Sequence, residues 1–379
     1  GALPASSGTY VHLAPGAGLA IRDVASTQAL RSSERDLGAP LRKVAAGRGV
    51  SMGTATDVWP PLHDLEFESL LGEQFDTVAP TELYWPTTRG EDQDYFFLPA
   101  DLMVNYATVH QQKVNGYFLV WDYELPHWVE ELAARGDGAA LGKALDEHIE
   151  TTVGRYKGRM SSWIVVNEAI WGPDETNGGP ARYGDSIWLG VPAADGTAED
   201  SAAGAVPPFI ERAFRVAHAA DPNARLIYNE TGAEAMNPKS QFMRDMAAKL
   251  LARRVPIDGI GLQFHLDGSK LPKMADVKEN MERIAALGLD VYITELDVSL
   301  ATVTGSEEEK RQLQADVYAD VLATCLAVPR CKSYTVFGFG DRYAWDELGD
   351  ASPLLFDEDY APKPAFFAVQ RGLGLAPPR

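Results

Sequence analysis

The stretch WIVVNEAIW, residues 163 to 171, decides the predicted fold. The run from Trp163 to Asn167 has the apolar and β-branched character of a buried strand, and the charged Glu168 follows it directly. A carboxylate at the edge of a core costs free energy unless it has a partner or a function. Because α/β barrels carry their chemistry at the carboxyl ends of their strands, this stretch predicts a barrel strand followed by a site residue.

The rest of the chain repeats the pattern of a short strand followed by an amphipathic helix. The predicted strands are residues 51–56, 76–79, 116–121, 163–167, 225–229, 259–264, 290–294 and 333–338. The predicted helices are residues 141–156, 208–219, 239–253, 275–286 and 307–325. An open doubly wound sheet is the alternative, but no glycine fingerprint follows the first strand. We therefore predict an α/β fold, a single-domain (β/α)8 TIM barrel over residues 41–379, with residues 1–40 as an N-terminal extension packed on or leading into it.

Composition narrows the class of protein. The net charge of −20 disfavours partners with phosphate groups, so we expect binding neither to nucleic acid nor to anionic membranes. No run of apolar residues is long enough to predict a membrane span. The chain begins at Gly1 with GALPASSGTY, which suggests a processed terminus, so we expect a secreted protein whose signal peptide is already absent. The small-residue stretch from Val191 to Val206 predicts a mobile insertion in the barrel.

Polar and aromatic side chains gather at the ends of the predicted strands. They are Trp121 and Asp122, Asn167 and Glu168, Tyr228, Asn229 and Glu230, Gln263 and His265, Thr294, Glu295 and Asp297, and Phe337, Asp341, Arg342 and Trp345. Carboxylates paired across a cleft are the groups that hydrolyse glycosidic bonds. Aromatic rings suit the apolar faces of sugars, and amides suit their hydroxyls. The set as a whole therefore predicts a glycosidase site.

Each member of this set also has a purely structural interpretation. Glu168 can be a carboxylate favoured at a helix N-terminus, and Glu295 can have the same role. Asp297 can cap a helix, and His265 can be a core histidine with satisfied hydrogen bonds. Cys325 and Cys331, the only cysteines, can form a small disulfide loop or remain two buried thiols.

Several motifs, in one order along the chain, resemble glycoside hydrolase family 10, the xylanase family. WIVVNEAIW resembles its acid/base motif, VYITELDV (291–298) its nucleophile motif and GIGLQFHL (259–266) its G-x-Q-x-H strand. Further landmarks are VAAGRGVSMGTAT (44–56), LVWDYELPHW (119–128), CLAVPRC (325–331) and PLLFDEDYAPKPAF (353–366). The resemblance implies a retaining mechanism with carboxyl groups about 5–5.5 Å apart. It also implies a disulfide between Cys325 and Cys331.

The resemblance further implies a role for each matching residue. Glu168 would be the general acid/base and Glu295 the nucleophile, while Asn167 would bind the sugar 2-hydroxyl. His265 would hold Glu295, with Asp297 fixing the imidazole. The substrate-binding candidates are Glu82, Trp85, Tyr117, Trp121, Asp122, Tyr228, Gln263, Phe337, Arg342 and Trp345.

The sequence departs from the family at positions that contact the sugar. The family's P-E-N-E-M-K-W is replaced by PTELYW (80–85), which lacks the lysine and the asparagine and keeps Glu82 as a carboxylate. Asp122 and Tyr117 stand where the family has histidines, and Phe337 where it has a tryptophan. An ionised Asp122 close to Glu295 would raise the pKa of one catalytic carboxyl. Catalysis is thus expected to be intact while the sugar contacts differ.

These observations predict a retaining glycoside hydrolase that resembles endo-β-1,4-xylanases and has a non-standard specificity. Its partner would be a carbohydrate or glycoside, and we expect a monomer that needs neither a cofactor nor a metal. The alternative is a xylanase-like barrel repurposed to bind or transform a non-carbohydrate small molecule. A non-catalytic carbohydrate-binding protein is less consistent with the sequence, because such a module would more often lack a catalytic carboxylate.

Overall fold

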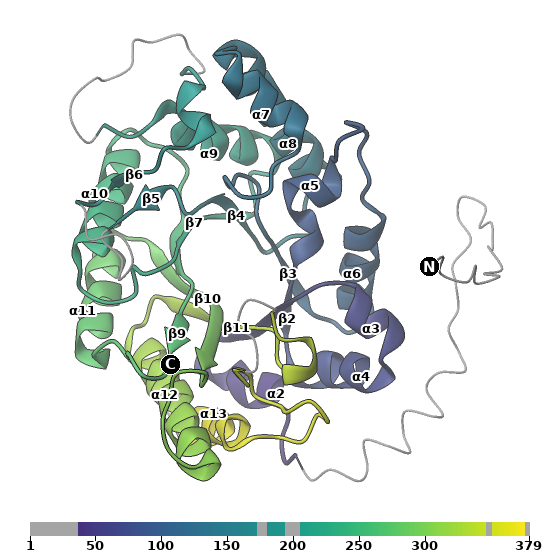
Figure 1. The fold of residues 1–379 in the computed structure, drawn as a ribbon, viewed down its shortest axis with the longest axis vertical. Helices are drawn as coiled ribbons and strands as arrows, with labels where there is room; N and C mark the ends of the chain where they lie inside the picture. Colours follow the sequence, from purple (N-terminus) through teal and green to yellow (C-terminus); the bar gives the residue numbers. More distant parts are fainter. Residues whose placement is uncertain (1–36, 173–179, 194–204, 346–350, 376–379) are drawn as a thin grey trace, which may run out of the picture. The chain divides into compact units, whose positions relative to one another are not determined.

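The computed structural model describes residues 37–172, 180–193, 205–345 and 351–375. Eight parallel strands in these ranges form one closed barrel (Figure 1). They are β1 (Ser51–Thr56), β2 (Thr77–Pro80), β3 (Lys113–Gly116), β4 (Ser162–Asn167), β7 (Arg225–Glu230), β8 (Gly259–Leu262), β10 (Asp290–Ser299) and β11 (Cys331–Phe337). The ring closes because β11 pairs with both β10 and β1. The predicted (β/α)8 barrel is confirmed.

Helices surround the strands in Figure 1. They are α2 (Leu41–Ala45), α3 (Trp59–His63), α4 (Leu65–Gln74), α5 (Trp85–Thr88), α6 (Leu98–Val109), α7 (His127–Ala134), α8 (Gly138–Arg155), α9 (Pro208–Ala220), α10 (Pro238–Ala252), α11 (Met274–Ala285), α12 (Glu307–Ala327) and α13 (Pro364–Leu375). Three short strands lie outside the ring: β5 (Ile170–Trp171), β6 (Arg182–Tyr183) and β9 (His265–Asp267). The five predicted helices correspond to α8 to α12, with ends that differ by at most three residues.

Local sequence explains where the helices begin. Ser306 and Glu309 form a reciprocal capping box at the start of α12, and Asn237 and Ser240 do the same for α10. Asp64 caps α4 by accepting hydrogen bonds from two backbone amides. These caps satisfy amide groups that have no partner inside the helix.

The third strand is where the sequence prediction was wrong. We predicted residues 116–121, but β3 is Lys113–Gly116. The neighbouring strand β2 ends at Pro80, so the chain beyond Gly116 has no partner on that side. Its backbone pairing continues with β4, where the amides of Leu119 and Val120 donate to the carbonyls of Ile164 and Val165.

Strand β10 extends further than predicted and carries site residues within it. β10 continues to Ser299, because its last three residues pair with β9. Glu295 and Asp297 therefore lie inside a strand that has a register shift between Ile293 and Leu296, rather than after its end. Such irregularities re-aim side chains next to active sites.

Glycines make room for large side chains in the barrel. A Cβ on Gly116 would lie 2.0 Å from the ring of the fully buried Trp163. A Cβ on Gly261 in β8 would lie 2.2 Å from Oδ1 of Asn229. Glycine at these two positions lets β4 bury its tryptophan and lets Asn229 lie inside the barrel.

The predicted disulfide is confirmed. It joins Cys325 near the end of α12 to Cys331 at the start of β11, with Cα atoms 5.4 Å apart. The predicted extension, residues 1–40, falls mostly on residues 1–36, which lie outside the described residues, and so do residues 194–204 of the predicted insertion.

Candidate active site

A cleft of about 670 Å³ lies at the carboxyl ends of the barrel strands. This volume is in the range of small-molecule sites. Its lining is Ala55, Thr56, Asp57, Pro60, Phe67, Thr81, Tyr84, Phe118, Trp121, Tyr123, Glu124, Asn167, Glu168, Thr231, Gln263, His265, Glu295, Phe337, Gly338, Tyr343 and Trp345. Carboxylates, amides and many aromatic rings therefore share one surface, as the strand-end pattern predicted.

Glu168 follows β4 directly and is half-buried at the cleft. Its backbone has φ of +54°, and its amide donates to the carbonyl of Asn229. The carboxylate accepts a hydrogen bond of 2.6 Å from Nε2 of Gln263 and one of 3.1 Å from Nε1 of Trp121. Donors from two different loops thus fix the orientation of the carboxylate.

Glu295 lies in β10 and is buried, with an exposed fraction of 3%. Its Oε1 accepts a hydrogen bond of 2.6 Å from Nδ2 of Asn229, and its Oε2 lies 3.4 Å from Nε2 of His265. Burial and the nearby charge of Glu168 raise the pKa of Glu295, against the opposing effects of His265 and Asn229. The two glutamates thus have different environments.

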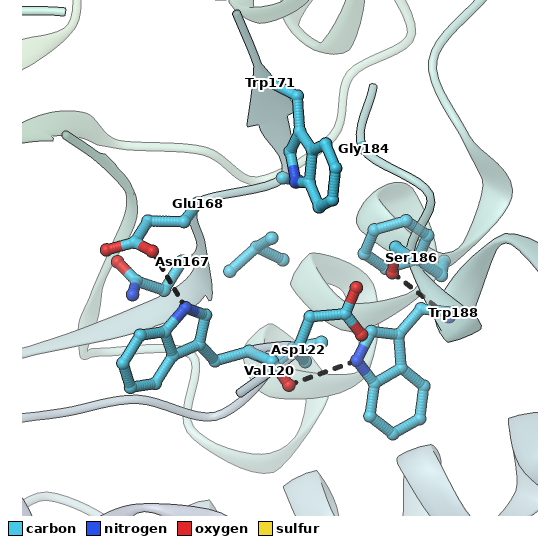
Figure 2. Close-up of a pocket in the computed structure, with 12 residues that line it drawn as sticks. Val120, Asp122, Asn167, Glu168, Trp171, Gly184, Ser186 and Trp188 are labelled. Carbon is cyan, nitrogen blue, oxygen red and sulfur yellow. Dashed lines mark hydrogen bonds between the residues drawn. The ribbon is translucent and has the colours of Figure 1, made fainter. Parts of the chain in front are cut away.

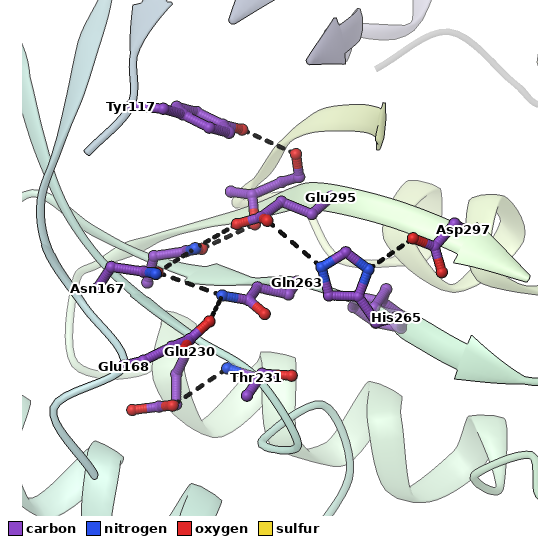
Figure 3. A network of polar contacts seen from close by, with 12 residues as sticks. Tyr117, Asn167, Glu168, Glu230, Thr231, Gln263, His265, Glu295 and Asp297 are labelled. Atoms are coloured by element: carbon purple, nitrogen blue, oxygen red, sulfur yellow. Dashed lines mark hydrogen bonds and ion pairs between the residues drawn. The ribbon is translucent and has the colours of Figure 1, made fainter. Parts of the chain in front are cut away.

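His265 bridges Glu295 and a second buried acid. Its Nδ1 lies 2.6 Å from Oδ2 of Asp297, which is fully buried (Figure 3). Burial lowers the pKa of His265, but the charges and hydrogen bonds of Asp297 and Glu295 outweigh burial and raise that pKa well above its usual range. The imidazolium form is therefore favoured, and it stabilises negative charge on Glu295.

Amide side chains connect the two glutamates (Figure 3). Nε2 of Gln263 contacts Glu168 and also Oδ1 of Asn167, at 3.2 Å. That same Oδ1 accepts a hydrogen bond of 2.8 Å from Asn229, which also holds Glu295. Nδ2 of Asn167 is buried without a hydrogen-bond partner, so it is available to a bound molecule.

A buried ionic cluster supports the backbone that follows Glu168. The amide of Ala169 donates to the hydroxyl of Tyr228, and the amide of Ile170 donates to Oε2 of Glu230. Glu230 also accepts from Tyr228 and pairs at 3.0 Å with Nζ of Lys239. Burial raises the pKa of Glu230 to about 7, although Lys239 and Tyr228 oppose that shift.

Comparison with known proteins assigns the family. The model of "Glycosyl hydrolase family 10" matches residues 40–371. The chain belongs to glycosyl hydrolase family 10. It is 33% identical over 337 residues to endo-1,4-beta-xylanase B of Thermotoga neapolitana, covering 87% of this chain and 90% of that protein. The crystal structure of native xylanase 10B from Thermotoga maritima is similar with a TM-score of 0.75 and 34% identity, over 88% of this chain and 98% of that one.

A second solved structure is the xylanase 10B of Thermotoga petrophila in complex with xylobiose. It has a TM-score of 0.75 and 33% identity, over 89% of this chain and 97% of that one. The family assignment and these relatives make this chain a xylanase-like glycoside hydrolase of a retaining family.

Among the residues predicted from the family pattern, eight line the cleft. They are Asn167, Glu168, His265, Glu295, Trp121, Gln263, Phe337 and Trp345. The rings of His265, Phe337 and Trp345 lie with centroids 5.3–5.8 Å apart and form one wall. Asp297 lies behind that wall, where it contacts His265, as predicted for a residue that fixes the imidazole.

Six predicted substrate contacts do not line the cleft, and three of these residues are core aromatics. Tyr117 is buried and donates its hydroxyl to the carbonyl of Thr294, so it supports β10. Tyr228 is buried in the cluster with Glu230. Trp85 is buried with its ring stacked 4.0 Å from that of His148. The structure therefore places these three side chains in the core rather than on the surface of the cleft.

The other three predicted substrate contacts outside the cleft are the polar residues Glu82, Arg342 and Asp122. Glu82 is buried and accepts a hydrogen bond from the amide of Val58. Arg342 is directed to Asp64 and to the carbonyl of Glu358.

Asp122 is exposed and lines a small pocket with Ser186 and Trp188 (Figure 2). This pocket adjoins the cleft, because Trp121, Asn167 and Glu168 line both. Burial, His265 and Glu168 are the main influences on the pKa of Glu295. Asp122 is not among them, so the geometry gives no support to the predicted effect of Asp122 on that pKa.

The cleft also includes residues that were not among the predicted site residues. They are Tyr84, Tyr123, Glu124 and Tyr343, and the first three lie within the family-like stretches 80–85 and 119–128. Asn229 contacts Glu295, and its place at the end of a predicted strand was a usable signal.

The described residues contain neither a candidate metal site nor a candidate membrane-spanning helix. Within 37–172, 180–193, 205–345 and 351–375, no group of three or more His, Cys, Asp or Glu side chains could hold a metal ion. In the same ranges, no helix combines the length and apolarity needed to cross a membrane.

Proposed function

We propose that this protein hydrolyses a β-glycosidic bond by double displacement, with Glu295 as nucleophile and Glu168 as general acid/base. Glu295 would attack the anomeric carbon and form a glycosyl ester, while Glu168 gives its proton to the leaving oxygen. Glu168 would then take a proton from water, which attacks the ester and releases the sugar. The observation that carries this proposal is that two glutamates line one cleft and have separate sets of hydrogen-bond donors.

The surrounding groups have roles that fit this chemistry. His265, charged and paired with Asp297, would keep Glu295 ionised and oriented. The unpartnered Nδ2 of Asn167 would donate to a sugar hydroxyl beside the anomeric carbon. Gln263 would hold Glu168 through both steps. Trp121, Phe337 and Trp345 would pack against the apolar faces of the sugar.

The proposed substrate is a β-1,4-linked xylan chain or a related glycoside, as the names of the similar xylanases suggest. Turnover of linear xylan is expected to be weaker than in a typical relative, because Tyr84 and Phe337 stand where the family pattern has a lysine and a tryptophan. Turnover of linear xylan at the level of a standard family member would contradict this expectation.

The roles of the glutamates can be separated by leaving-group chemistry. Glu168→Gln and Glu295→Gln should each abolish hydrolysis of unactivated oligosaccharides, with circular dichroism unchanged. An aryl glycoside with an acidic phenol needs no protonation, so Glu168→Gln should still release a burst of phenol, whereas Glu295→Gln should not. Glu308→Gln, exposed in the first turn of α12, is the matched control. Near-full turnover by either catalytic variant, or a burst from Glu295→Gln, would refute the assignment.

The stereochemistry gives an independent test. Proton NMR of the first product should show the β-anomer, because two displacements retain configuration. An α-anomer would refute the double displacement.

We also propose that the protein is secreted. The disulfide between Cys325 and Cys331 supports this, because disulfides persist in oxidising compartments. Detection of the native protein in the culture medium of its source cells would test the proposal, and its confinement to the cytosol would refute it.

A further inference from the structure

Nearly all the ionisable groups that line the cleft are acidic. The ionisable acids on this surface are Asp57, Glu124, Glu168 and Glu295. Among the described lining residues there is no lysine and no arginine, and His265 is the one group that can be cationic. The charge of His265 is already matched by Asp297 and Glu295, which contact its two ring nitrogens. The described residues that line the cleft therefore present negative charge to a ligand, and they present no positive charge that lacks an acidic partner.

Nearby guanidinium groups do not change this balance. Arg342, beyond Tyr343, lies 3.4 Å from Asp64 and stacks on the ring of Tyr360. Arg182 lies near Trp171 and pairs with Asp185 at 3.0 Å. Both cations are neutralised by acids of their own surroundings, and neither lines the cleft.

Tyr84 provides an uncharged donor on the same wall as the acids. Its ring lies 5.3 Å from that of Trp121, the residue that donates to Glu168. Its hydroxyl is buried without a hydrogen-bond partner. Burial, then the charge of Glu124 and of other acids nearby, raise the pKa of Tyr84 above its usual range. The hydroxyl therefore stays neutral and can donate to a neutral acceptor such as a sugar hydroxyl.

From this arrangement we propose that the cleft accepts glycosides with neutral or cationic groups near the scissile bond and rejects anionic ones, because Glu124 supplies a repelling charge and Tyr84 places an uncharged group, instead of a cation, on the same wall. The physical reason is like-charge repulsion in a surface cleft, where solvent screens charges less than in bulk water. A carboxylate on a substrate, as on a uronic-acid branch, meets Glu124 and Asp57, and no uncompensated cation stands among the described lining residues. The inference rests on the proposed function, because it concerns the substrate of the same site.

The test uses aryl β-xylobiosides that differ only in a remote group on the ring: carboxymethyl, carbamoylmethyl or aminomethyl. The methylene spacer keeps the leaving-group acidity similar across the three. The kcat/KM of the carboxymethyl probe should be at least tenfold below that of the carbamoylmethyl probe, and the aminomethyl probe should equal or exceed the latter. Raising the ionic strength from 20 mM to 500 mM should shrink the ratio, because salt screens exposed charges.

Binding of the corresponding 1-thio-β-xylobiosides, which resist hydrolysis, separates this inference from the proposed function. Quenching of tryptophan fluorescence should give the same order of affinities, since Trp121 and Trp345 line the cleft. Charge selection in binding with no turnover of any probe would refute the proposed function alone. Equal affinity for the carboxymethyl and carbamoylmethyl probes, or no binding of any of them, would overturn the inference.

Variants identify the determinants. Tyr84→Lys and Glu124→Gln should each reduce the neutral-to-anionic ratio at least threefold. Tyr84→Phe should weaken binding of all three probes by a similar factor and leave the ratio unchanged, because it removes a hydroxyl and no charge. Glu130→Gln, exposed on α7, is the charge-matched control. An unchanged ratio in Tyr84→Lys and Glu124→Gln would overturn their assignment as determinants.

Discussion

Replacing Lys239 by methionine should destabilise the protein strongly. Lys239 and Glu230 have exposed side-chain fractions of 3% and 0%, and their charged atoms lie 3.0 Å apart. Methionine keeps the length and apolar stem of lysine but leaves the carboxylate of Glu230 without a cation. Removing one partner of a buried pair typically costs about 3–5 kcal/mol, because the remaining charge is buried without compensation. The hydrogen bonds from Tyr228 and Ile170 should keep the loss near the lower end of that range.

The pH dependence of this loss has a definite sign. Burial already raises the pKa of Glu230 from 4.5 to about 7 in the folded chain, and removing Lys239 should raise it further. Since the folded state holds this proton more tightly than the unfolded state, stability falls as the pH rises through that interval. The difference between wild type and Lys239→Met should therefore be larger at pH 8 than at pH 5, where Glu230 is protonated in both folded proteins.

Urea unfolding followed by tryptophan fluorescence at pH 5 and pH 8 measures both effects. The double variant Glu230→Gln/Lys239→Met should recover at least half of the loss at pH 8, because it removes the unpaired charge. Lys278→Met, which breaks an exposed pair with Glu282 on α11, is the control and should cost less than about 1 kcal/mol. A loss below 1 kcal/mol in Lys239→Met, or a double variant as unstable as the sum of its single variants, would refute the reasoning.

Two further predictions follow from the contacts of the site and of the barrel wall. In Asp297→Asn the pKa of His265 should fall, and the pKa of Glu295, with less positive charge beside it, should rise. The acidic limb of kcat/KM should then move to higher pH, and an unmoved limb would contradict the role proposed for His265 and Asp297. The double variant Cys325→Ser/Cys331→Ser should lose about 2 kcal/mol of unfolding free energy, as expected for a short disulfide loop, with kcat unchanged. A loss of kcat in the folded double variant would contradict a purely structural role of the disulfide.

Periodicity and strand-end chemistry were sufficient to predict the barrel, since each apolar run that we assigned as a strand overlaps an observed one. The boundary errors have a physical origin in pairing. Whether residues after Gly116 continue a strand depends on Pro80 of β2, which ends that strand and leaves one side without a partner. The extension of β10 through Glu295 depends in the same way on β9. Neither partner is visible in the local sequence.

The site was predictable where a side chain belongs to the end of a strand, and unpredictable where it belongs to a loop. Glu168, Gln263 and Glu295 lie at or next to barrel strands, whose alternation directs them to the cleft. Tyr84 and Trp85 are adjacent aromatics at the start of α5, whose first residue is Trp85, and no periodicity tells them apart. The first lines the cleft, whereas the second stacks on His148 in the core. Their orientation follows from tertiary packing, so the sequence could not show which of the two lines the cleft.

This division between strands and loops also explains how one barrel can keep its chemistry and change its substrate. The groups that hold the two glutamates are interlocked: Asn229 contacts Asn167 and Glu295, and Gln263 contacts Asn167 and Glu168. A substitution at any of them disturbs both carboxylates at once, so this part of the site tolerates little change. The wall that carries Tyr84 and Glu124 makes no hydrogen bond to that amide chain in the described structure. It is connected to Glu168 through Trp121, which packs on Tyr84 and donates to that carboxylate. The charge of this wall can therefore change while the amide contacts of both glutamates are kept, which is the property that a change of specificity requires.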